Sequence, residues 1–291
     1  MRLEGKTALV YGAAGPMGGA VSRAFASEGA RLFLAGRTGS TVASLAEEIT
    51  TQGGEAHAAE VDVDDREAVE RHADSVMESA GRIDISFNAV AVNAVQNVAL
   101  VEMAVDDFMM PVTEAARRNF VTATAAARRM AQEGTGAILM LTSSAAREWR
   151  HQMGGFSLAC ASIEVLTRTL AGELKGTGVR VACIRANFTP ETVPGLPEGA
   201  TDALLADILI PRLPRLHEIG AAAVYLASDD AGAITGSVLD LTCGAIVKLR
   251  PRPSSRLGPA RGMHFRPAVS RRHHRADRPR RRAGPSSVSG S

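Results

Sequence analysis

At 291 residues with 45% hydrophobic side chains, the chain has enough apolar surface for one large packed domain. It contains no run of about 18 uncharged apolar residues, so we expect no membrane association. The N-terminal segment MRLEGKTALVYG enters a strand pattern at once, which predicts no signal peptide. Cys160, Cys183 and Cys243 lie far apart without a CxxC pair. We therefore expect reduced thiols, a cytoplasmic location and no bound metal.

The net charge of +2 combines two oppositely charged parts. Residues 250–291 contain twelve arginines and one acid, Asp277, whereas the rest of the chain holds 21 basic and 30 acidic residues. The basic part is rich in Pro, Ser and Gly and cannot bury enough apolar surface to fold alone. We therefore expect a folded domain at 1–249 and a disordered tail at 250–291. The charge of the tail would suit nucleic acid, but without interleaved aromatic residues we favour a solvated tail with no nucleic-acid partner.

Strand-like and helix-like segments alternate along the predicted domain. Strands are predicted at 6–11, 31–35, 55–61, 83–88, 137–142, 179–184 and 238–241. Helices are predicted to begin near Met17, Ser40, Asp65, Asp106, Gly154 and Leu216. The alternation indicates an α/β fold, a Rossmann-type doubly wound three-layer domain around a seven-stranded parallel sheet. Residues 186–214 interrupt it with few strand formers, which predicts a lid or substrate loop.

A glycine-rich segment, YGAAGPMG at 11–18, follows the first predicted strand and precedes a helix. Glycines at such a turn let the backbone approach a pyrophosphate, and the helix N-terminus supplies free N–H groups and a favourable dipole. The order strand, turn, helix, strand within about 35 residues favours a dinucleotide site over a plain turn.

The second predicted strand ends in LAGRT, without the acid that bonds the ribose hydroxyls of NAD. Arg37, followed by Thr38, suits a 2′-phosphate because a guanidinium binds it through paired hydrogen bonds. The alternative is a solvated loop arginine. We expect NADP(H) as the cofactor.

These segments resemble the short-chain dehydrogenase/reductase family over residues 3–247. The family signature TGxxxGxG is matched with Tyr11 in place of Thr and Pro16 in place of the middle glycine, while Gly15 stands one place earlier. Asp62 and Val63 match the pair beside the adenine, with a helix cap as the alternative interpretation. Asn88 matches the first residue of the NNAG motif and would tie the fourth strand to its neighbour. The cofactor-binding residues implied by the resemblance are Gly12, Gly15, Met17, Gly18, Arg37, Thr38, Asp62, Val63 and Asn88.

The resemblance also implies a catalytic site with two replaced residues. In the family, a Tyr transfers the substrate proton, a Lys four residues later lowers the pKa of that Tyr, and a Ser and an Asn assist. Ser143 and Asn119 match the Ser and Asn positions. In FSLACASIEVLTRTLAGEL, however, Phe156 stands at the Tyr position and Cys160 at the Lys position. Because positioned acid–base catalysis contributes ~10²–10⁴ in rate, simple carbonyl reduction should be severely impaired.

Two side chains are candidates to replace the missing groups. His151 lies between Ser143 and Phe156 and could act as an acid, because histidine generally titrates near neutral pH, but an exposed loop histidine is the favoured interpretation. Cys160 would be a nucleophile if a cation activated it, but we favour an inert buried thiol.

By resemblance the protein is an oxidoreductase that transfers hydride between NADP(H) and a small carbonyl or alcohol compound through a non-standard active site. The resemblance also implies a homodimer or homotetramer built on two alanine-rich helices, predicted at 106–132 and 154–175. Two alternatives stay open. One is a catalytically silent NADP(H)-binding or partner subunit, and the other is a reductase of activated double bonds that needs no tyrosine acid.

Overall fold

The computed structural model describes residues 1–149, 152–206 and 208–247. Backbone contacts group Met1–Lys248 into one compact unit. The predicted tail at 250–291 and the candidate acid His151 lie outside the described residues, so the expectations about them stay predictions.

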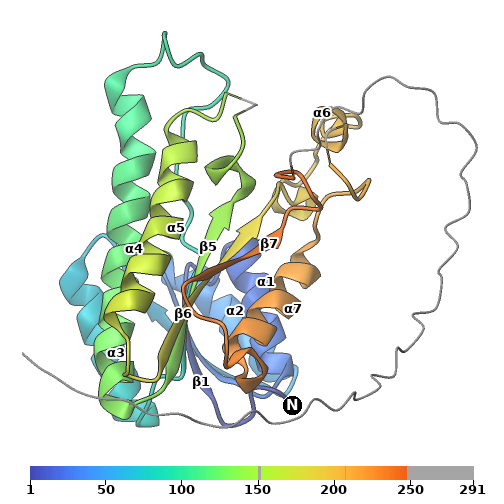
Figure 1. The fold of residues 1–291 in the computed structure, drawn as a ribbon. Coiled ribbons are helices and arrows are strands. Elements are labelled where there is room, and N and C mark those ends of the chain that lie inside the picture. The colour runs from blue at the N-terminus through green and yellow to red at the C-terminus, as the bar shows by residue number, and fades with distance from the viewer. Residues whose placement is uncertain (150–151, 207, 248–291) are drawn as a thin grey trace, which may run out of the picture. The chain divides into compact units, whose positions relative to one another are not determined.

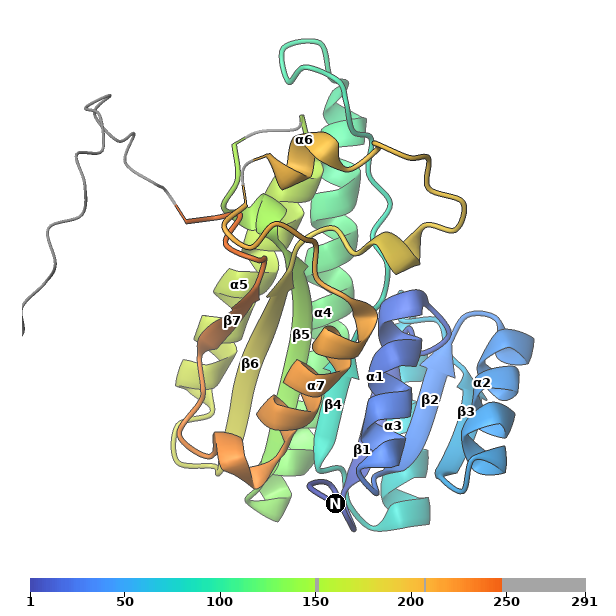
Figure 2. The same ribbon diagram turned by 90° about the vertical axis from the view of Figure 1, so that its right-hand side faces the viewer.

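Seven parallel strands form one sheet in the order β3-β2-β1-β4-β5-β6-β7 (Figure 2). The strands are β1 (Thr7–Tyr11), β2 (Arg31–Gly36), β3 (Glu55–Glu60), β4 (Ile85–Asn88), β5 (Gly136–Ser143), β6 (Val179–Ala186) and β7 (Ser237–Leu241). The predicted α/β fold class is confirmed. The strand order reverses between β1 and β4, and ligands of open α/β sheets bind at the carboxyl ends of the strands beside such a reversal.

Helices cover both faces of the sheet (Figure 1). One face carries α1 (Pro16–Ser27), α2 (Gly39–Thr51) and α7 (Leu216–Ala227), and the other carries α3 (Arg66–Ala80), α4 (Val105–Glu133) and α5 (Gly155–Glu173). Each face has its own buried apolar cluster, and all five residues of the central strand β1 are buried between them. A strand covered on both faces reads as a continuous apolar run, which is why TALVY does not alternate.

The predicted lid at 186–214 contains two short helical segments, η2 (Pro190–Thr192) and α6 (Asp202–Leu205). Figure 2 shows α6 above the carboxyl edge of the sheet. None of the helices within the described ranges is both long and apolar enough to cross a bilayer.

Tyr11 points into the apolar cluster under α3 and α4. Its ring meets the ring of His72 edge-on, with centroids 5.9 Å apart. Tyr11 Oη and His72 Nδ1 are buried without a hydrogen-bond partner. Burial raises the pKa of Tyr11 and lowers the pKa of His72 to about 4. His72 is therefore neutral in the folded protein at physiological pH.

This depressed pKa predicts a loss of stability in acid. The unfolded chain, with a histidine pKa near 6.5, takes up a proton that the folded chain refuses until about pH 4. The stabilisation is thus complete above pH 6.5 and lost as the pH falls towards 4. It amounts to about 2–3 kcal/mol of unfolding free energy between pH 7 and 4.5.

Replacing His72 with Phe should remove this part of the pH dependence, because phenylalanine keeps an aromatic ring against Tyr11 and cannot be protonated. Urea unfolding at pH 7 and 4.5 measures the difference. The exposed His217→Gln variant is the control and should keep the parental slope. An unchanged slope in His72→Phe would contradict the assignment.

Candidate cofactor and active site

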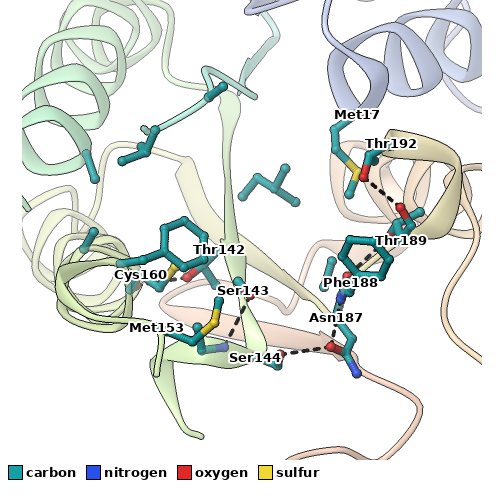
Figure 3. Close-up of a pocket in the computed structure, with 18 of the residues that line it drawn as sticks. Met17, Thr142, Ser143, Ser144, Met153, Cys160, Asn187, Phe188, Thr189 and Thr192 are labelled. Atoms are coloured by element: carbon teal, nitrogen blue, oxygen red, sulfur yellow. Dashed lines mark hydrogen bonds between the residues drawn. The ribbon is translucent and has the colours of Figure 1, made fainter. Parts of the chain in front are cut away.

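A cavity of about 730 Å³ opens at the carboxyl edge of the sheet, beside the reversal of strand order (Figure 3). Its wall comes from residues 15–17 of the glycine turn, the loop after β4, the end of β5 and the segment that follows it, Ala115 on α4, helix α5, and the lid. The wall is mostly apolar, with Met17, Met153 and Phe188 among its larger side chains. This combination of a switch point, an apolar wall and a few polar groups is typical of cofactor and substrate sites.

Two glycines close the turn after β1. Gly12 has a φ of +73°, and a Cβ at this position would lie 2.7 Å from the carbonyl oxygen of Ala89. A Cβ on Gly18 would overlap the carbonyl oxygen of Gly12. Gly15 differs, because its Cβ would meet only that same oxygen, at 3.4 Å, and Gly15 lines the cavity. The turn is therefore tight against the loop after β4 and open towards the cavity.

The N-terminus of α1 has backbone amides that could bind an anion. No side chain caps it and its first turn holds no acid. Pro16 has no N–H to offer, and the N–H of Gly19 already donates to the carbonyl of Gly15 at 2.7 Å. The amides of Met17 and Gly18 remain at the start of the helix. These features fit the pyrophosphate of a dinucleotide.

The sequence predicts that Arg37 and Thr38 bind the adenosine half of the cofactor. Both are exposed at the end of β2, and we call this part of the carboxyl edge the adenosine edge. Thr38 is the N-cap residue of α2 by backbone geometry, but its side chain makes no capping bond. A Cβ on Gly36 would lie 2.9 Å from Cγ2 of the buried Val42. An acid at position 36 would therefore require Val42 to move.

Asp62 and Val63 follow β3. Val63 is buried, whereas Asp62 is exposed and its Oδ1 accepts from the amide of Asp64 at 3.0 Å. The cap of α3 is Asp65, which accepts from the amides of Glu67 and Ala68. Asp62 thus has no capping role.

Asn88 ties β4 to a helix and not to a neighbouring strand, which corrects the expectation from the sequence. Its Nδ2 donates to Thr122 Oγ1 on α4 at 2.7 Å, and its Oδ1 accepts from the amide of Val90 at 2.9 Å. The physical reason is that the side chain stands out of the plane of the sheet, towards the helix that covers this face.

A buried arginine that the sequence analysis missed joins the loop after β3 to the loop after β4. Arg118 on α4 makes paired hydrogen bonds to Asp64, at 2.9 and 2.8 Å, and donates to the carbonyl of Ala91 at 3.0 Å. It also bonds Glu114 at 2.8 Å. The hydrogen bonds from Arg118 hold the pKa of Asp64 below its usual value. The available signal was a doubled arginine within an alanine-rich helix.

Three of the four candidate catalytic residues lie together on the cavity wall: Ser143, Phe156 and Cys160. Ser143 Oγ accepts from the amide of Ala145 at 3.3 Å, and the carbonyl of Cys160 accepts from Thr142 Oγ1 at 3.0 Å (Figure 3). Burial raises the pKa of the Cys160 thiol to about 11, so it is neutral near pH 7.

Asn119, the fourth candidate, stands behind the wall. The cavity is lined by Ala115, one turn earlier on α4. Asn119 Nδ2 donates to the carbonyl of Ala115 at 2.9 Å, and its Oδ1 is buried without a partner. Its amide group therefore keeps one free acceptor close to the cavity.

The lid begins with a group of hydrogen bonds around Asn187. Asn187 Oδ1 accepts from Ser144 Oγ at 3.2 Å and from the amide of Phe188 at 2.7 Å (Figure 3). Thr189 Oγ1 donates to the carbonyl of Asn187 at 3.2 Å. These bonds join the start of the lid to the end of β5, beside Ser143.

A buried ion pair, also missed from the sequence, lies one helical turn beyond Cys160. Arg185 on β6 makes paired hydrogen bonds to Glu164 on α5, at 2.8 and 2.7 Å, and both side chains are almost completely buried. Asp240 lies 3.5 Å from the guanidinium of Arg185, and Arg147 lies 3.6 Å from Glu164. The pair fastens α5, which carries positions 156 and 160, to the sheet. An arginine inside the buried strand VRVACIRA was the signal for it.

The two tyrosines lie away from the cavity wall. Tyr11 is buried under α3 and α4, and Tyr225 lies on α7. Within the described ranges, no group of three or more His, Cys, Asp or Glu side chains is arranged to hold a metal ion.

Comparison with known proteins identifies the class of this fold and site. A family model described as Enoyl-(Acyl carrier protein) reductase matches residues 12–245. D-threitol dehydrogenase of Mycolicibacterium smegmatis is 32% identical over 85% of this chain and 95% of its own length. The 3-oxoacyl-[acyl-carrier-protein] reductase FabG of Thermotoga maritima is 27% identical over 85% of this chain and all of its own.

A solved short-chain type dehydrogenase/reductase from Mycobacterium marinum is similar in structure, with a TM-score of 0.77 and 29% identity, covering 84% of this chain and 97% of that one. The fold and the cleft therefore define an oxidoreductase that uses a nicotinamide cofactor. The chain belongs to the short-chain dehydrogenase/reductase family.

Proposed function

We propose that the protein binds NADP(H) across the switch point and transfers hydride to or from a small carbonyl or alcohol compound, without a tyrosine–lysine pair. The observation that carries the proposal is one continuous cavity that reaches from the glycine turn to Ser143, Phe156 and Cys160. A nicotinamide and a substrate would thus share a wall whose side chains at positions 156 and 160 are uncharged.

The geometry supports the following cofactor roles. Gly12, Gly15, Met17 and Gly18 would receive the pyrophosphate at the start of α1, since this turn is tight on one side and open on the other. Arg37 and Thr38 would face the 2′-phosphate, Asp62 and Val63 the adenine, and Asn88 would hold the loop after β4 in place. When bound, the nicotinamide supplies or accepts the hydride.

The catalytic roles are divided differently from those of relatives with tyrosine and lysine. The hydroxyl of Ser143 would hydrogen-bond the substrate oxygen, and Asn119 would act from behind the wall through its free Oδ1. Phe156 would pack against the substrate and exclude water. Cys160 stays a neutral thiol, so it would leave the tyrosine position without a neighbouring cation.

A second candidate is the reduction of an activated double bond. Hydride added to the β carbon of an enone gives an enolate whose oxygen Ser143 could stabilise by a hydrogen bond, and water can protonate the carbon. The uncharged wall at Phe156 and Cys160 favours this chemistry, since it needs no tyrosine acid. The description of the matching family model, an enoyl reductase, points the same way.

The proposal includes a homodimer or homotetramer in the cytoplasm. Helices α4 and α5 pack against each other and expose Phe120, Leu158 and Val165. Burying these apolar side chains between copies would be favourable.

Turnover tests the proposal directly. NADPH consumption by the full chain against matched ketones and enones distinguishes the two chemistries. Oxidation of NADPH in the presence of either the ketones or the enones supports hydride transfer. Tight NADPH binding without any turnover would favour a silent binding subunit.

Cofactor choice gives a second test. NADPH should bind at least about tenfold more tightly than NADH, because a charge-assisted guanidinium–phosphate contact contributes ~1.5–3 kcal/mol. Arg37→Leu should abolish the preference and leave NADH affinity unchanged. We choose position 37 because an acid at position 36 would collide with Val42.

Fluorescence titration with both cofactors measures these affinities. Lys175→Met is the matched control, since it removes one exposed cation beyond the far end of α5. Equal affinities for NADPH and NADH in the parent protein would refute the assignment of Arg37.

A further inference from the structure

The end of β3 brings a carboxylate to the adenosine edge. Glu60 is the last residue of β3 and pairs in register with Gly36, the last residue of β2. Gly36 is the position at which a NAD-binding sheet commonly carries its acid. The side chains of both positions are directed towards α2, since a Cβ on Gly36 would meet Val42 and Glu60 reaches Gly39. A carboxylate absent from β2 is therefore present on the neighbouring strand.

This carboxylate lies at the first residue of α2. Glu60 Oε2 accepts from the amide of Gly39 at 3.1 Å. A Cβ on Gly39 would lie 2.6 Å from that oxygen, so glycine permits the approach. Glu60 is exposed to solvent and thus accessible to a ligand.

Arg37 and Glu60 bring opposite charges to the turn between β2 and α2, because Glu60 bonds the amide of Gly39 two residues after Arg37. Arg37 is two residues before Gly39, which limits the separation of their Cα atoms to about 7 Å. A 2′-phosphate held by Arg37 against this turn would be close to the Glu60 carboxylate, and exposed charges interact when they are separated by less than one Debye length, about 10 Å at 0.1 M salt. The phosphate would be repelled by Glu60, whereas a 2′-hydroxyl could donate a hydrogen bond to it.

We infer that Glu60 is a specificity-determining residue for the 2′ position of the cofactor ribose. It provides from β3 the carboxylate that β2 lacks. Its charge reduces the ratio of NADPH affinity to NADH affinity that Arg37 creates. This inference rests on the proposed binding of a nicotinamide dinucleotide in the cleft.

Glu60→Gln tests the inference in the full chain, because glutamine keeps an acceptor oxygen for Gly39 and removes only the charge. NADPH should bind about twofold to fivefold more tightly at low salt, the effect of one unit charge acting across about 4–10 Å in water. NADH should bind no more tightly than before. The gain for NADPH should shrink in 0.5 M salt, because salt screens exposed charges.

The matched control is Glu55→Gln at the opposite end of the same strand. Five residues of strand separate the two positions by about 17 Å, well beyond the screening distance, so this variant should leave both affinities unchanged. An unchanged or weaker affinity of Glu60→Gln for NADPH, or an equal gain for NADH, would overturn the inference while leaving the proposed function intact. A parent protein that binds neither cofactor would overturn the proposed function itself.

Discussion

The double variant Phe156→Tyr/Cys160→Lys is expected to reduce simple ketones at least about a hundredfold faster than the parent protein. The reason is that a positioned acid contributes ~10²–10⁴ in rate, and both changed positions lie on the cavity wall beside Ser143. NADPH consumption with a series of small ketones measures the effect. Cofactor titration and circular dichroism on the same samples verify binding and folding.

The two substitutions should act together and not separately. Tyrosine alone, with a pKa near 10, is a poor acid at neutral pH, and lysine alone has no hydroxyl to polarise. A lysine beside the tyrosine lowers the pKa of the phenol, so the rates should be strongly non-additive. Phe156→Tyr/Cys160→Met is the matched control, since methionine adds length at position 160 without charge.

Rapid ketone reduction by the parent protein would contradict the proposed roles of positions 156 and 160. It would indicate another proton donor, and His151→Gln would then be the first variant to test.

Arg185→Leu is expected to lower the free energy of unfolding by about 3 kcal/mol, because it removes both hydrogen bonds that Arg185 gives to the buried Glu164 and leaves only the exposed Arg147, 3.6 Å away, as a nearby cation. Glu164→Leu/Arg185→Leu should recover much of this loss, since neither charge then remains buried. Urea unfolding at pH 7 measures both variants.

The exposed pair formed by Arg212 and Glu218 is a suitable control. Its geometry is also paired, with distances of 2.8 and 2.7 Å, but Arg212 is about half exposed. Arg212→Leu should therefore change the unfolding free energy by at most about 1 kcal/mol. Equal losses of unfolding free energy in the Arg185 and Arg212 variants would show that burial of the Glu164–Arg185 pair does not increase the cost of breaking it.

The fold could be predicted well from the sequence because its signals are local. Apolar runs alternate with helical segments, and Gly12 and Gly18 mark the turn between the first strand and α1. The meeting of Ser143, Phe156 and Cys160 followed from the resemblance to the family, and the structure puts all three on one wall.

The charged partners could not be predicted in this way. Glu60 is positioned by the register between β2 and β3, and Arg185 finds Glu164 only after α5 packs on β6. Arg118 joins loops that are far apart in the chain. Such pairs depend on tertiary packing, and no spacing within the sequence encodes them. Asn119 lies behind the wall for the same reason, because helix packing decides which face of α4 meets the cavity.

The Glu164–Arg185 ion pair near Cys160 also determines the order in which laboratory evolution would select the two substitutions. Glu164 and Arg185 already neutralise each other, so a lysine introduced at position 160 arrives as an additional cation in a buried place and lowers stability before it aids any reaction. Tyrosine at position 156 adds only a hydroxyl and should be nearly neutral. A selection for ketone reductase activity should therefore fix Phe156→Tyr first, and substitutions near Glu164 should accompany the later appearance of lysine.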